Sequence, residues 1–206
     1  MATLSVIYYS STGNTYQVAR AIADGAHEAG AEVRLRKVRE LAAAEAVSGN
    51  PAWKAHQEAT REVREASLDD LEWADGLVFG TPTRFGLPAA QLKQFIDTAG
   101  PLWAKGKLQD KMVGAFTGAL SAHGGQESTL LALYNVFYHW GSLIVPAGYT
   151  DQVVYAAGGN PYGVSFTDAK GRKQPEEILA AARYYGRRIA TFAEALVAGR
   201  AQLTEA

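Results

Sequence analysis

A run of small polar residues joins the first apolar segment of the chain to its first amphipathic segment. It contains hydroxyl, amide and glycine residues and no lysine: Ser10, Ser11, Thr12, Gly13, Asn14 and Thr15. If a helix begins here, its free backbone N–H groups point outward and favour an anion. The Walker and Gly-x-Gly-x-x-Gly patterns for larger phosphate groups are missing. The run fits one terminal phosphate, and an ordinary Ser/Thr helix cap is the alternative interpretation.

Two later segments also follow apolar runs and carry residues suited to a ligand. In the first, two prolines fix the loop path and an aromatic ring neighbours a cation; its candidates are Pro82, Thr83, Arg84 and Phe85. The second has small residues that leave room for a flat ring; its candidates are Thr117, Gly118, Ala119, Leu120, Ser121, His123 and Gly124. A plain turn before a helix is the alternative for the first segment. Because the carboxyl ends of parallel strands meet at one edge, we expect all three segments to line one crevice.

Histidine is scarce, with four residues in the chain, and two of them lie near these segments. His123 and His139 are candidate polar groups beside a cofactor, although a structural role is the commoner one for a single histidine. Trp103, taken alone, is typical of a surface-loop aromatic.

The elements that position these residues follow from hydrophobic patterning. Five apolar runs indicate buried strands at residues 4–9, 31–38, 76–80, 111–117 and 143–145. Amphipathic stretches between them predict helices. One carries Val18, Ile22 and Ala26, one spans residues 90–98, and a further one carries Leu130, Leu133, Tyr134 and Phe137. The last begins at Pro175 and turns Ile178, Ala182, Tyr185, Ile189, Phe192 and Leu196 inward. This alternation is typical of a parallel sheet covered on both faces, in a single domain over residues 1–206. We expect residues 42–70 to form an exposed loop with a short helix and the remaining crossover to the next strand. Residues 146–174 are expected to form a structured loop, and connections of this length tend to be binding loops.

Composition narrows the function classes. The 20 basic and 21 acidic residues give a formal net charge of −1, which argues against a nucleic-acid binder. The chain has no cysteine, so disulfides and thiolate chemistry are excluded and any redox work must come from a bound cofactor. With no basic leader and no apolar run near 18 residues, the sequence predicts a cytoplasmic protein without membrane insertion.

Over roughly residues 4–196, these motifs together resemble the WrbA family of flavodoxin-like quinone reductases. The most distinctive string is Phe-Gly-Thr-Pro-Thr-Arg-Phe-Gly at residues 79–86, and Leu-Trp-Ala follows at 102–104. Gly-Gly-Gln-Glu at 124–127, His139 with Gly141, and Pro-Tyr-Gly at 161–163 fall in the family order. The resemblance implies an α/β, flavodoxin-like, doubly wound five-stranded parallel sheet of order 2-1-3-4-5 with helices on both faces.

The resemblance also implies a cofactor and an activity. FMN would place its phosphate on residues 10–15 and its ring between the loops at 82–85 and 117–124. His139 would act at the flavin. Trp103 would form part of the wall of the pocket that NAD(P)H and quinone occupy in turn. Thr12 stands where relatives often have a tyrosine that touches the nicotinamide, so it belongs to the substrate side. Family members are typically homotetramers whose neighbouring subunits help to close each site.

Two rival functions remain open at this stage. A flavodoxin-type one-electron carrier would be expected to show a strongly acidic docking face, and the net charge of −1 speaks against one. A flavin-binding accessory module without turnover is the other. Reduction by NADH separates both from an enzyme.

Overall fold

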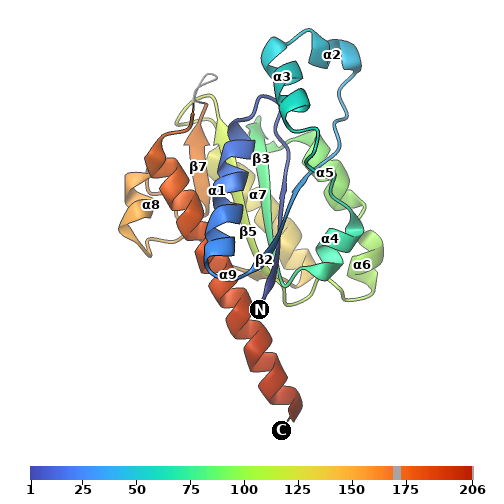
Figure 1. Ribbon diagram of the computed structural model, residues 1–206, viewed down its shortest axis with the longest axis vertical. Helices are drawn as coiled ribbons and strands as arrows, with labels where there is room; N and C mark the ends of the chain where they lie inside the picture. Colours follow the sequence, from blue (N-terminus) through green and yellow to red (C-terminus); the bar gives the residue numbers. More distant parts are fainter. Residues whose placement is uncertain (169–172, 206) are drawn as a thin grey trace.

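The computed structural model describes residues 1–168 and 173–205 of the chain (Figure 1). The helices and strands follow in this order: β1 (Thr3–Tyr8), α1 (Asn14–Glu28), β2 (Glu32–Lys37), α2 (Ala44–Ser48), α3 (Pro51–Ala59), α4 (Leu68–Trp73), β3 (Gly76–Arg84), β4 (Leu87–Pro88), α5 (Ala90–Asp97), α6 (Gly100–Ala104), β5 (Met112–Ala119), α7 (Gln126–Trp140), β6 (Leu143–Ile144), α8 (Gln152–Ala156), β7 (Val164–Thr167) and α9 (Glu176–Glu205). Within those residues no helix is long and apolar enough to cross a membrane.

The central sheet has the order β2-β1-β3-β5-β6, and neighbouring strands along this path run parallel. The predicted order 2-1-3-4-5 and the flavodoxin-like doubly wound fold are therefore confirmed. Two strands share the fifth position of the sheet: β6 pairs with the beginning of β5, and β7 pairs with its end. The short strand β4 folds back antiparallel on the end of β3. All three predicted ligand segments thus leave the same edge of the sheet.

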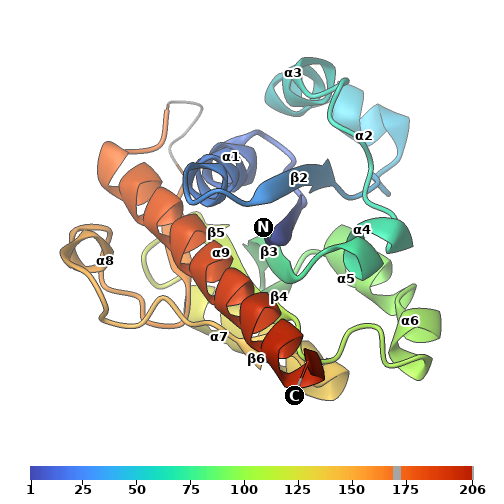
Figure 2. The ribbon, with the colours of Figure 1, turned by 60° about the horizontal axis from the view of Figure 1, so that its bottom comes forward.

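Helices cover both faces of this sheet, as predicted. Figure 2 shows α1 and α9 side by side on one face, with α4, α5 and α7 on the other. Each face has its own core: Val6 and Tyr8 of β1 pack with α1 and α9, whereas Ile7 packs with the opposite layer. Burial on both faces explains why the strands appear in the sequence as continuous apolar runs.

Helices α1 and α9 approach so closely that their backbones touch. A Cβ atom added at Gly25 of α1 would lie 2.0 Å from the carbonyl oxygen of Arg183, and one at Gly186 of α9 would lie 2.0 Å from that of Ile22. Both are closer than real Cβ atoms are found. Each glycine is therefore required by the crossing of the two helices.

One of the two long connections differs from expectation. Residues 42–70 were predicted to hold a loop, one short helix and the remaining crossover, but they form α2, α3 and the beginning of α4. These three helices are short, and their charged, Ala-rich sequence shows no clear hydrophobic periodicity from which they could be predicted. Residues 146–174 are structured as predicted over their described part and add α8 and β7; residues 169–172 lie outside the described residues.

The prediction that Phe192 turns inward is wrong. Its side chain is 43% exposed, and Ala193 is the residue buried at this level of α9. Helix α9 turns Ala193, not Phe192, toward the sheet, where a Cβ atom added at Gly76 of β3 would lie 3.6 Å from Ala193 Cβ. The Arg188 guanidinium lies over the ring instead, 5.0 Å from its centroid.

Candidate active site

A pocket of about 470 Å³ opens at the carboxyl ends of β1, β3 and β5, within the size range of small-molecule sites. The three predicted segments meet in its wall, as expected from the strand order. The predicted residues that line it are Ser10, Ser11, Thr12, Asn14, Thr15, Pro82, Thr83, Arg84, Phe85, Gly118, Ala119, Leu120, Ser121 and Gly124. A cluster of His, Cys, Asp or Glu suited to a metal ion is absent from the part of the chain that the structure describes.

Three other predicted residues stand behind or beside this wall. Gly13 is the N-cap of α1 and has a φ of 97°, a conformation that favours glycine. Thr117 is fully buried, and its hydroxyl is used within the protein. His123 is exposed on the loop after β5.

The beginning of α1 fits a phosphate. The helix has no side-chain cap and no acidic residue in its first turn, although it is 15 residues long. Its first N–H groups have no carbonyl partner in the helix and adjoin a pocket lined by hydroxyls. The Ser10 hydroxyl accepts a hydrogen bond from the Gly13 N–H at 3.0 Å, which curls the loop around the helix end. Uncapped donors and the positive end of the helix dipole together favour a bound anion.

Three threonines hold the loop after β3 in place. The Thr117 hydroxyl on β5 donates to the Thr81 carbonyl at 2.7 Å and lies 3.0 Å from the Thr83 hydroxyl. On α7, the Thr129 hydroxyl donates to Thr83 Oγ1 at 3.2 Å. This buried chain of hydroxyls links β3, β5 and α7 beneath the pocket. Thr117, a predicted cofactor contact, thus supports the wall from behind.

The tip of the β3–β4 hairpin projects an aromatic ring at the pocket mouth. Phe85 has a φ of 53° and Gly86 a φ of 79°, so two consecutive residues adopt left-handed conformations. For a phenylalanine this is uncommon and costs on the order of 1 kcal/mol. The Phe85 side chain is fully exposed in the single chain. The two positive φ angles are those of a two-residue hairpin turn between Arg84 and Leu87, which places the exposed ring in the pocket wall.

Trp103 and His139 lie together but outside this pocket. The Trp103 indole N–H donates to the His139 carbonyl at 2.9 Å, and both residues line a separate open groove of about 360 Å³. His139 is near the end of α7, about 20 Å along the helix from its beginning at the pocket edge. The chain then enters β6, which pairs with the beginning of β5. One chain therefore places these two residues at the opposite end of the sheet from the pocket.

Two residues of the pocket wall, Phe166 and Asp168, were missed by sequence reasoning. They belong to β7 and the position after it, and the Asp168 N–H donates to the Ala119 carbonyl at 2.8 Å. The unusual length of residues 146–174 indicated a functional loop. No local pattern, however, could reveal which strand end β7 would join.

Asp168 places a carboxylate next to the phosphate loop. Its Oδ1 accepts a hydrogen bond from Asn14 Nδ2 at 2.7 Å, and Asn14 Oδ1 in turn accepts one from Gln174 Nε2 at 3.0 Å. Both ends of the Asn14 amide are thus bound inside the protein. Asn14 is left to offer its backbone N–H to a phosphate, while Asp168 brings a carboxylate to the same corner.

We expect Asp168→Asn to strengthen FMN binding about threefold, because a like charge near an exposed phosphate costs on the order of 1 kcal/mol. Riboflavin, which has no phosphate, serves as the control ligand, and its affinity should not change. Quenching of flavin fluorescence on titration with apoprotein measures both dissociation constants. Weaker FMN binding by the variant would mean that the carboxylate accepts hydrogen bonds from the cofactor.

Fold and pocket together define a flavodoxin-like protein with a site for one flavin mononucleotide. The model of the NADPH-dependent FMN reductase family matches residues 4–152. A NAD(P)H dehydrogenase (quinone) of Deinococcus radiodurans is 49% identical over 90% of this chain and 92% of its own, and one of Sinorhizobium fredii is 42% identical over 95% and 99%. The chain belongs to the NADPH-dependent FMN reductase family, and its resemblance to the WrbA-type quinone reductases is confirmed.

Solved structures agree with this assignment. A WrbA-like flavodoxin of Agrobacterium tumefaciens superposes with a TM-score of 0.65 and 28% identity, over 94% of this chain and 98% of its own. A flavodoxin from the domain Archaea superposes with a TM-score of 0.62, over 93% and 99%. At 17% identity this second likeness concerns the fold alone.

Proposed function

We propose that this protein is an FMN-dependent NAD(P)H:quinone oxidoreductase that reduces quinones to hydroquinones with two electrons. The observation that carries the proposal is the pocket at the uncapped beginning of α1, lined by three strand ends. The 49% identical relative named NAD(P)H dehydrogenase (quinone) supports the same activity. Because NAD(P)H is an intracellular reductant, we place the reaction in the cytoplasm.

Bound FMN supplies the redox chemistry, since it accepts a hydride from NAD(P)H and passes two electrons to a quinone. Residues 10–15 bind its phosphate through backbone N–H groups and hydroxyls. The loop at 82–85 and the loop at 118–124 position the flat ring between them. Both substrates would enter the same open pocket in turn, and Thr12 is among the residues that line it. Because NAD(P)H supplies a hydride, one further proton completes the hydroquinone, and solvent at this open mouth would supply it.

A homotetramer would bring Trp103 and His139 to the flavin. Within one chain they are at the far end of the sheet, so the predicted roles require that another subunit supply them. Exposed apolar side chains lie on both surfaces that would meet. Phe85 and Leu120 line the pocket and Trp103 lines the groove, and all three side chains are exposed. Covering these side chains gives assembly a hydrophobic driving force.

Anaerobic mixing with NADH tests the activity directly. We expect NADH to bleach the FMN absorbance within seconds and benzoquinone to restore it. Initial rates at varied NADH and quinone should give parallel double-reciprocal lines, as a shared site requires. FAD should not replace FMN, because residues 10–15 offer a cradle for one phosphate. A flavin that stays oxidised in NADH for minutes would favour the electron carrier.

A further inference from the structure

One acidic side chain, Glu40, joins three segments around the phosphate loop. Glu40 Oε2 accepts hydrogen bonds from the Tyr9 hydroxyl at 3.0 Å and the Trp53 indole N–H at 3.1 Å. Glu40 Oε1 accepts one from Gln91 Nε2 at 2.8 Å and two from the backbone N–H groups of Leu41 and Ala42. Burial alone would raise the pKa of Glu40, but these hydrogen bonds outweigh it and hold the pKa below its usual value. The carboxylate is therefore charged at neutral pH.

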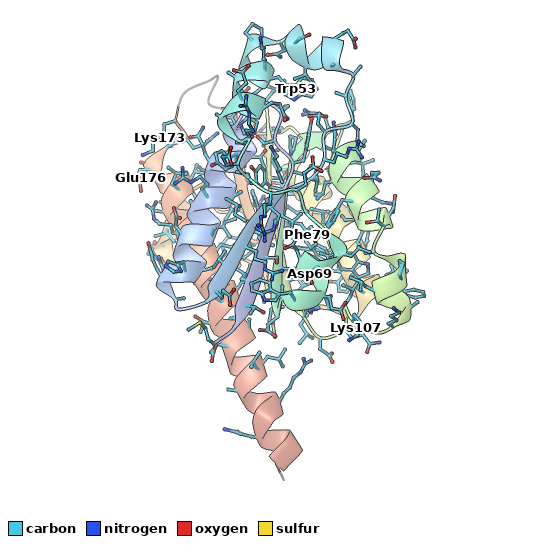
Figure 3. All side chains as sticks on the ribbon, turned by 45° about the vertical axis from the view of Figure 1, so that its right-hand side comes forward. Trp53, Asp69, Phe79, Lys107, Lys173 and Glu176 are labelled. Atoms are coloured by element: carbon cyan, nitrogen blue, oxygen red, sulfur yellow. The ribbon has the colours of Figure 1, made fainter. Side chains whose placement is uncertain are left out.

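The three side-chain donors come from different parts of the fold. Tyr9 immediately precedes the phosphate loop, and Gln91 is in the first turn of α5, just after the loop at 82–88. Gln91 Nε2 also approaches the Tyr9 hydroxyl at 2.9 Å. Trp53 belongs to the arm, which we define as residues 41–66 with α2 and α3. Figure 3 labels Trp53 in this arm, beyond the carboxyl end of the sheet.

The arm in turn supports the phosphate loop from behind. His56 of α3 is buried, and a Cβ atom built on Gly13 would lie 3.4 Å from His56 Nδ1. The His56 ring also packs on Tyr16 of α1, with ring centroids 5.6 Å apart. Burial and the nearby Lys37 ammonium lower the pKa of His56 to about 4, so the ring packs as a neutral group. The position of the arm thus limits where Gly13 and the loop around it can move.

We propose that Glu40 is a positioning residue for the flavin phosphate: it docks the arm against the end of β1, and the docked arm holds the phosphate loop in its binding conformation. The proposal rests on the FMN-binding part of the proposed function. Glu40 itself is not among the residues that line the pocket. Its effect on FMN must therefore pass through Tyr9, Trp53 and the arm.

Glutamine at this position cannot reproduce the carboxylate. A Gln side chain has one accepting oxygen, while donors approach both oxygens of Glu40. If the amide oxygen faces Gln91, the NH₂ group faces the Trp53 indole N–H, which can only donate. If the amide is flipped, three donors lose their acceptor.

The test compares flavins with and without a phosphate. We expect Glu40→Gln to raise the dissociation constant of FMN about tenfold, as the loss of a charge-assisted hydrogen bond implies. Riboflavin affinity should change by less than about twofold, because the Thr117 and Thr129 hydroxyls hold residues 81–83 and Gln91 keeps the Tyr9 hydroxyl as a partner. Trp53→Phe, which keeps an aromatic ring but removes one donor, should weaken FMN binding about threefold. Glu58→Gln removes an exposed charge from the same arm and should change neither affinity.

Each outcome decides the proposal. An equal loss of FMN and riboflavin affinity in Glu40→Gln would indicate a general structural role and overturn it, and so would an unchanged FMN affinity. If Glu40→Gln does not fold, the comparison of FMN affinity with riboflavin affinity can still be made with Trp53→Phe. A wild-type chain that binds no FMN would overturn the proposed function as well, whereas tight wild-type binding with a normal Glu40→Gln variant would overturn the role of Glu40 alone.

Discussion

Replacing Trp103 by alanine is expected to lower kcat/KM for benzoquinone about 30-fold, the effect of losing an aromatic contact of about 2 kcal/mol. FMN affinity should stay within about twofold of the wild-type value, because the phosphate loop is at the other end of the sheet. The Trp103 side chain is 57% exposed in the single chain, so its removal leaves no large cavity in the core. Steady-state kinetics and FMN titration give the two values.

A subunit-mixing experiment shows where Trp103 acts. Ser11→Glu puts a carboxylate into the phosphate cradle and should abolish FMN binding by charge repulsion. Ser11→Glu should then be inactive alone, and Trp103→Ala alone should keep only about one thirtieth of the wild-type kcat/KM for benzoquinone. Hybrid oligomers should recover activity, because FMN bound by a Trp103→Ala subunit can meet Trp103 of a Ser11→Glu subunit. Hybrids without activity would contradict a site shared between subunits.

Replacing Gly186 by alanine is expected to lower the free energy of unfolding of the apoprotein by about 2–3 kcal/mol. The added methyl would meet the Ile22 carbonyl of α1 at 2.0 Å, and a backbone carbonyl cannot rotate away as a flexible side chain can. Helix α9 must shift to relieve the contact, which loosens its packing on the sheet. The apoprotein Tm should fall by roughly 5–10 °C, as measured by circular dichroism or calorimetry.

Gly199→Ala is the matched control for this helix. Gly199 is also in α9, and a Cβ atom there would have no heavy atom within 4 Å. Alanine should stabilise the apoprotein by up to about 1 kcal/mol, because it lowers the entropy lost when the helix forms. If Gly186→Ala behaved like Gly199→Ala, the close contact between α1 and α9 would be refuted.

Local sequence was enough to predict five strands of the sheet and most of the pocket wall, whereas the strand order followed from the resemblance to the WrbA family. Alternating apolar runs and amphipathic stretches require strands covered on both faces, and parallel strands bring their carboxyl ends to one edge. The polar run at residues 10–15 therefore had to meet the loops after β3 and β5. The alternatives of a plain helix cap and a plain turn could not be separated from a ligand site by sequence, because both use the same residue types. The structure favours the site, because α1 begins without a side-chain cap at a pocket.

By itself, the sequence determined five strands, the main helices between them and the chemistry at three strand ends, since these depend on periodicity and residue type within short windows. Only the tertiary structure decided which distant segments meet. It placed Trp103 and His139 in a separate groove, brought Asp168 beside Asn14 through the pairing of β7 with β5, and gathered Tyr9, Trp53 and Gln91 around Glu40. These contacts join residues far apart in the chain, and their hydrogen bonds depend on how whole helices and strands pack. Patterns within a short stretch of sequence do not determine that packing.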